Sequence, residues 1–188
     1  MTAIEPGTTR RHSWFHRTWP PAAGLAVGLA SGIGIADGAE VAPVVAASGF
    51  VYLVAAALGS RFAAWPAFAV SVVLIAAAKV VPGFAPTWGM LAIGAVLLLL
   101  GLARGRRRPP WGLPLQAAAM LVLGAVALLA AEVSPTWSGV LVAGALLVHA
   151  AWDVHHHRTG RVVVPSMAVF CAVLDTALAG LVLAVTLT

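Results

Sequence analysis

The sequence predicts an all-α fold, a polytopic bundle of about seven transmembrane helices with a cytoplasmic N-terminus. Three observations lead to this prediction. Of the 188 residues, 61% are hydrophobic and only 9% are charged, whereas soluble domains carry roughly 25% charged residues. Apolar runs long enough to cross a bilayer follow one another along most of the chain. Basic residues fall in short clusters between these runs. So few charges cannot coat a water-facing surface, and we expect most of the surface to face lipid.

The chain divides into a short tail and one membrane domain. A basic, tryptophan-containing segment at 1–20 is typical of the cytoplasmic membrane interface, and the transmembrane domain occupies 21–188. The apolar runs are continuous rather than alternating, which favours helices over a β-barrel. They predict spans at 21–36, 40–59, 64–81, 87–103, 113–131, 136–157 and 165–186.

Charge placement predicts the orientation of these spans. Seven spans put the tail and the second, fourth and sixth connections on one side of the membrane, and these segments hold all eleven Lys and Arg residues except Lys79. Asp37, Glu40 and Glu132 fall on the other side. The positive-inside rule places the arginine side in the cytoplasm of an inner (plasma) membrane, with the C-terminus outside. The net charge of +5 then suits anionic lipid headgroups, and we expect no nucleic-acid partner.

Two patterns bear on how the helices pack. Gly24, Gly28 and Gly32 form a stripe at spacing four, which lets another helix backbone approach closely inside the bundle. Pro-Thr-Trp opens the spans that begin near 86 and 135. This recurrence indicates three two-helix hairpins in one orientation plus a seventh helix, although Pro and Trp are also common at helix starts and interfaces.

One dense polar cluster lies on the last turns of the predicted sixth helix. At about 100° per residue, His149, Asp153 and His156 share one face and His157 flanks it. His155 points away. Imidazoles and a carboxylate on successive turns can hold a divalent metal ion. These four residues are therefore candidate ligands.

Depth in the membrane adds a fifth candidate ligand. Counted from the cytoplasmic helix ends, Asp175 on the seventh helix lies nearly level with His149 on the sixth. Because an ionisable side chain inside a membrane rarely faces lipid, we expect His149 to be the partner of Asp175. Cys171 lies one turn shallower, and we expect it to be buried and inert rather than a nucleophile.

Three interpretations of this cluster stay open. The first is a metal site, with zinc preferred over iron, in which Asp153 and Asp175 act as acid–base groups in hydrolysis of a lipid-like substrate. The second is a proton relay in a transporter or proton-coupled carrier. The third is a structural hydrogen-bond network in a membrane subunit without chemistry. The sequence alone leaves open whether the protein is an enzyme.

The same stretch resembles a family of small polytopic membrane proteins that carry a domain of unknown function. Its members have a His-x-x-Trp-Asp-x-x-His-His box and a downstream Cys-x-x-x-Asp on the last helix. The resemblance covers roughly the last 40 residues and implies no known activity. The matching positions are His149, Trp152, Asp153, His156, His157, Cys171 and Asp175.

Two better-understood groups share parts of this pattern. Membrane desaturases and hydroxylases use several His-x-x-His-His boxes for a di-iron centre, whereas this chain has only six histidines. The seven-helix alkaline ceramidases and adiponectin receptors have a zinc site of three His with Asp and Ser. Their ligands also lie on early helices, and the first five spans predicted here contain no histidine. These similarities make a metal site plausible without assigning an activity.

Overall fold

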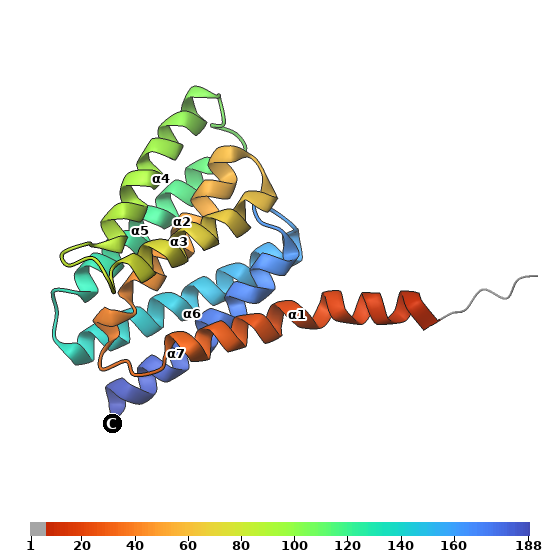
Figure 1. The fold of residues 1–188 in the computed structure, drawn as a ribbon. Coiled ribbons are helices and arrows are strands. Elements are labelled where there is room, and N and C mark those ends of the chain that lie inside the picture. The colour runs from red at the N-terminus through yellow and green to blue at the C-terminus, as the bar shows by residue number, and fades with distance from the viewer. Residues whose placement is uncertain (1–6) are drawn as a thin grey trace, which may run out of the picture.

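The computed structural model describes residues 7–188 and contains seven α-helices joined by short connections (Figure 1). The described residues contain no β-strand, so the all-α prediction is confirmed. Side chains are described at Trp14 and from Arg17 onwards, and the basic residues predicted near 10–12 lie outside this part. The elements are α1 (Gly7–Ser31), η1 (Gly38–Glu40), α2 (Ala42–Leu58), η2 (Arg61–Ala63), α3 (Ala64–Ala77), α4 (Pro86–Ala103), α5 (Leu113–Ala130), α6 (Pro135–Thr159) and α7 (Pro165–Leu187).

Proline and glycine explain most of the helix boundaries. Helices α2, α4, α5, α6 and α7 each carry a proline in the first two positions, where its missing N–H removes no helical hydrogen bond. At the other end, α2 is capped by Gly59 and α6 by Gly160, with φ of 61° and 62°. A left-handed residue ends a helix, and glycine adopts this conformation without steric cost.

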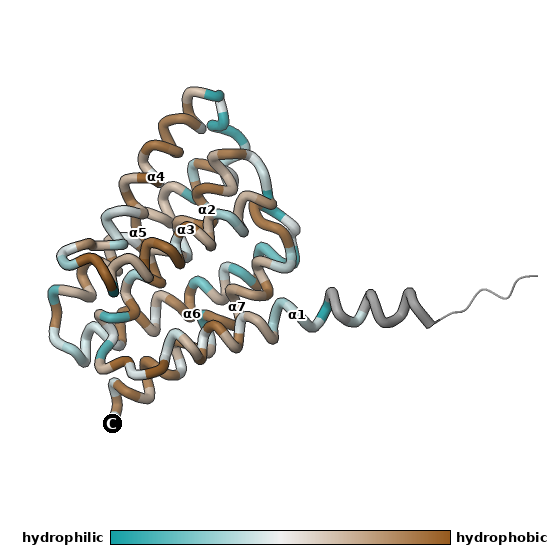
Figure 2. Tube along the Cα trace, in the orientation of Figure 1, coloured by the Kyte–Doolittle hydropathy of each residue, from teal (hydrophilic) through white to brown (hydrophobic). Residues whose placement is uncertain are grey.

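The helices have the length and composition of a membrane protein. Five are long and apolar enough to cross a bilayer: α2 together with η1, and each of α4 to α7. Helix α3 with η2 covers only Arg61–Ala77 and is shorter, and it ends four residues before the predicted limit at 81. Hydrophobic residues fill the helix bodies, and hydrophilic ones gather mainly at the connections (Figure 2). That α1 and α3 also cross the membrane therefore stays a prediction.

Helix α1 differs most from its predicted span of 21–36. It begins at Gly7 and ends at Ser31, so the described part of the basic tail and most of the predicted first span form one continuous helix. It packs along α7, and the predicted glycine stripe makes the contact. The Gly24 backbone lies against the Phe170 carbonyl group, and a Cβ on Gly28 would come within 2.9 Å of the Leu174 carbonyl oxygen. Residue numbers rise in the same direction along both helices at these contacts, so α1 and α7 run parallel.

Helix α2 is the centre of the bundle and is buried along almost its whole length. It packs against α3, α4 and α5, while α6 and α7 pack closely against each other. Gly139 near the start of α6 lies against Thr186 at the end of α7, so these two helices are antiparallel. The predicted first hairpin would pair α1 with α2. Instead, α1 packs mainly against α7, and α2 packs mainly against α5 and α4.

The connections between α2 and α3, α4 and α5, and α6 and α7 meet at one end of the bundle. Arg61, Arg106 and Arg161, one from each connection, line the same hollow. The chain therefore runs away from this end along α3 and back to it along α4, and it does the same along α5 and α6. These three basic connections thus lie together at one end of the bundle. That this end, with the tail, faces one side of a membrane stays a prediction, as does which side it is.

Candidate functional site

Charged and imidazole side chains gather inside the bundle where α2, α6 and α7 meet. His149 and Asp153 lie one turn apart on α6, and Asp175 lies on the adjacent α7. The exposed fractions are 4% for His149, 0% for Asp153 and 1% for Asp175. The antiparallel packing of α6 and α7 brings the predicted partners together at equal height.

Distances within the group define its hydrogen bonds. His149 Nδ1 lies 2.8 Å from Asp175 Oδ2 and 3.3 Å from Asp153 Oδ2. A neutral or charged imidazole carries at most one hydrogen on Nδ1. The shorter contact takes that hydrogen, which agrees with Asp153 Oδ2 having no hydrogen-bond partner. The predicted meeting of His149 with Asp175 is therefore present as a direct hydrogen bond.

Tyr52 on α2 is a fourth member that the sequence did not predict. Its hydroxyl donates a 2.6 Å hydrogen bond to Asp153 Oδ1, and its ring packs edge-on against His149 and His156. Ser48, one turn earlier on α2, interacts with the Asp175 carboxyl group. Tyr52 is the only tyrosine in the chain. A lone phenol inside an apolar run needs a polar partner when buried, and this was the available signal.

The other predicted ligands do not join the group. His156 is buried, but its Nδ1 lies 3.1 Å from the Trp152 carbonyl oxygen and its ring lies between Tyr52 and Trp152. His157 is exposed on the last turn of α6. The structure thus brings together three of the five predicted ligands. Cys171 is buried, with its thiol 3.5 Å from the Met167 sulfur.

The group carries more negative than positive charge. Two carboxylates face one imidazole, and among the described residues no Lys or Arg side chain is buried. An imidazolium can balance only one carboxylate. Leaving the other charged inside an apolar bundle would be costly. The site therefore requires one further positive charge, either a proton or a cation.

The geometry fits a small divalent cation. One nitrogen of His149 and one oxygen from each of Asp153 and Asp175 all lie within 4.8 Å of one another. Zinc binds nitrogen and oxygen ligands at about 2.0–2.1 Å with tetrahedral geometry, which separates neighbouring ligand atoms by about 3.3 Å. The His149–Asp153 distance of 3.3 Å equals this spacing, whereas the His149–Asp175 distance of 2.8 Å is that of a hydrogen bond and would have to lengthen when a metal binds. Three protein ligands leave a fourth position, as in catalytic zinc sites.

An apolar cavity of about 300 Å³ adjoins the group between α2, α5 and α6. Exposed side chains such as Leu115, Val122 and Val148 form part of its wall, so it opens towards the lipid-facing surface. Two buried polar atoms of its lining residues have no hydrogen-bond partner: His149 Nε2 and Gln116 Oε1. An apolar cavity with a few such groups is typical of a site for an amphipathic ligand.

Comparisons of the chain with protein-family models, with curated proteins and with solved structures returned no match. The family resemblance of the last 40 residues therefore stays a prediction.

Proposed function

We propose that this protein is an integral membrane metalloprotein that binds one zinc ion through His149, Asp153 and Asp175. The observation that carries the proposal is the convergence of these three ligands from two helices, with a carboxylate charge that no buried cation balances. Divalent zinc would supply the missing charge and would suit the nitrogen and oxygen donors.

The cavity beside the group supports hydrolysis of a lipid-like substrate as the activity. A bound zinc ion supplies an activated water in such sites. Tyr52 holds Asp153 Oδ1, so Asp153 Oδ2, which lacks a hydrogen-bond partner, would be the oxygen that binds the zinc. Asp175 would bind the zinc beside His149 Nδ1, which lies 2.8 Å from its Oδ2, and the other carboxylate oxygen of Asp175 would take the proton of the water. A substrate from the bilayer would lie in the cavity with its polar group towards His149 and Gln116.

A second function is favoured by a different observation. Tyr52, Asp153, His149 and Asp175 follow one another at distances of 2.6, 3.3 and 2.8 Å. A chain of ionisable groups inside a membrane can carry protons. In a proton-coupled carrier, the extra positive charge would be a proton rather than a metal ion.

Metal analysis of the purified full-length protein separates these functions. We expect one zinc ion per chain in wild type, and loss of that zinc in His149→Ala and Asp153→Asn. His157→Ala is the matched control, because it removes an exposed imidazole from the same helix and should keep the metal. The protein is prepared without a histidine tag, and circular dichroism shows that each variant is helical.

A folded protein without metal, after growth in zinc-supplemented medium, would contradict the metalloprotein. Proton flux into liposomes that is lost in Asp175→Asn would then establish the carrier. A metal-free protein with no flux would leave a structural subunit, in which the group is a hydrogen-bond network.

A further inference from the structure

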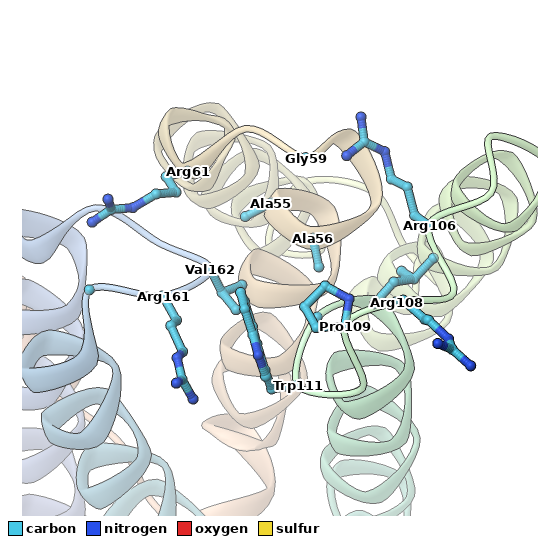
Figure 3. Close-up of a pocket in the computed structure, with 13 residues that line it drawn as sticks. Ala55, Ala56, Gly59, Arg61, Arg106, Arg108, Pro109, Trp111, Arg161 and Val162 are labelled. Atoms are coloured by element: carbon cyan, nitrogen blue, oxygen red, sulfur yellow. The ribbon is translucent and has the colours of Figure 1, made fainter.

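A second hollow, distinct from the His–Asp–Asp group, lies at the arginine-rich end of the bundle. It measures about 290 Å³ and lies between the connections that follow α2, α4 and α6 (Figure 3). Four arginines line it: Arg61, Arg106, Arg108 and Arg161. The side chains of Arg61 and Arg108 extend away from its centre (Figure 3). Its remaining walls are apolar or aromatic and include Trp111 and Val162.

The positive charge of this hollow has no acidic counterpart among the described side chains. No described carboxylate lines it, and no ion pair between an arginine and Asp or Glu is formed by the side chains at 14 and 17–188. Three helices end here and three begin, so their dipoles largely cancel. Because like charges repel, arginines gathered at one end of the bundle without carboxylates are stabilised by an anion.

Two of the guanidinium groups lie directly against other residues that line the hollow. The Arg106 guanidinium packs directly over Gly59, where any side chain would collide with it. The Arg161 guanidinium carbon lies 4.9 Å from the centre of the Trp111 ring, at the distance of a cation–π contact. Such contacts reduce the conformational entropy that a ligand would have to remove.

One of these groups also lacks a protein partner. Arg106 Nε is buried and has no hydrogen-bond acceptor, whereas Arg61 Nε donates to the Val163 carbonyl oxygen at 3.2 Å. An unpaired buried donor costs free energy, and a guanidinium edge matches the oxygens of a phosphate. The hollow thus combines positive charge, a hydrogen-bond donor that has no acceptor in the protein, and an apolar wall.

We infer that this hollow binds a phosphate group of a negatively charged amphipathic molecule. The apolar wall beside Trp111 and Val162 suits a glycerol backbone or the first carbons of an acyl chain. Trp111 is also 40% exposed, and tryptophan prefers the depth of lipid headgroups. A phospholipid headgroup and a soluble phosphate ester share this phosphate chemistry.

The experiment titrates the full-length protein in an uncharged detergent with short-chain phosphatidylglycerol, phosphatidylcholine, glycerol phosphate and inorganic phosphate, using calorimetry. We expect phosphatidylglycerol to bind and phosphatidylcholine to bind more weakly, since its ammonium group is repelled by the arginines. The double variant Arg106→Gln/Arg161→Gln should weaken binding by about tenfold or more, because it removes two charge-assisted contacts.

The matched control is Arg104→Gln/Arg107→Gln. It removes the same charge, and both of its arginines are exposed outside the hollow; binding should change little. Single variants at Arg106 and Arg161 are measured in case the double variant is misfolded. Binding of phosphatidylglycerol that excess inorganic phosphate does not displace identifies a lipid headgroup. Binding of the soluble phosphates with equal affinity identifies a soluble source.

Equal losses in the two double variants would overturn the inference, because the hollow would then act only through net charge. Absence of binding by every phosphate compound would overturn it as well. Neither result bears on the metal site, which lies in the interior of the bundle and shares no residue with this hollow.

Discussion

Replacing Tyr52 with phenylalanine tests whether the phenol supports the His–Asp–Asp group. The substitution deletes the donor of the 2.6 Å hydrogen bond to Asp153 Oδ1 and leaves that oxygen buried. The ring stays the same size, so its packing on His149 and His156 is retained. Any change can therefore be assigned to the hydroxyl group.

The expected loss of stability follows from the environment of the bond. Interhelical hydrogen bonds in a membrane protein contribute about 0.6 kcal/mol on average and at most about 1.7 kcal/mol. The contact from Tyr52 to Asp153 is short, buried at both ends and made to a carboxyl group. Charge-assisted bonds of this kind are about twice as strong as neutral ones. We therefore expect Tyr52→Phe to lower the free energy of unfolding by about 1.5 kcal/mol.

The effect on the metal site should be larger. Groups that hydrogen-bond to a metal ligand typically change metal affinity by about 10- to 100-fold when they are removed. We expect a loss in this range for zinc in Tyr52→Phe, measured by competition with a chelator. Stability is measured by equilibrium unfolding in mixed micelles, and this measurement is repeated in an Asp153→Asn background, in which we expect no bound zinc.

In that background the phenylalanine substitution should have a smaller effect, because the charged acceptor is already gone. We expect a coupling free energy of about 1 kcal/mol between the two positions. A coupling of zero, together with unchanged zinc affinity, would show that the Tyr52–Asp153 contact does not support the group.

Three further predictions concern packing, the cavity and topology. Gly24→Leu should prevent α1 from docking on α7 and increase proteolysis of α1, whereas Gly144→Leu should not, since its Cβ would meet nothing within 4 Å. Ala119→Trp should fill the 300 Å³ cavity and abolish hydrolysis of lipid esters while the zinc content stays unchanged; loss of zinc would contradict this. Single cysteines replacing Arg107 and Glu132, in a background without the native cysteine, should be labelled from opposite sides of the membrane, and labelling from one side would refute the topology.

Much of the fold could be predicted because prolines and glycines mark the helix boundaries. Pro86, Pro135 and Pro165 begin helices close to the predicted positions. The packing of α1 against α7 could not be predicted, because a glycine stripe shows that a helix is approached closely but not by which partner. The end of α3 at Ala77 depends on turns that the apolar run conceals.

The part of the site formed by His149 and Asp175 was predicted, because helix geometry alone determines it. His149 and Asp175 meet because two consecutive antiparallel helices bring equal depths together. His156 shares the predicted face but turns towards Trp152 and Tyr52, since its ring finds aromatic neighbours and a backbone carbonyl group there. The role of Tyr52 depends on which helix packs against α6, and nothing in the local sequence encodes this.

X-ray absorption at the zinc edge of the purified protein tests the metal centre most directly. The proposed zinc site should show one imidazole nitrogen and two carboxylate oxygens at about 2.0–2.1 Å, with a fourth light-atom ligand that exchanges with solvent. Sulfur in the first coordination shell, a second imidazole, or no bound zinc in folded protein would contradict it.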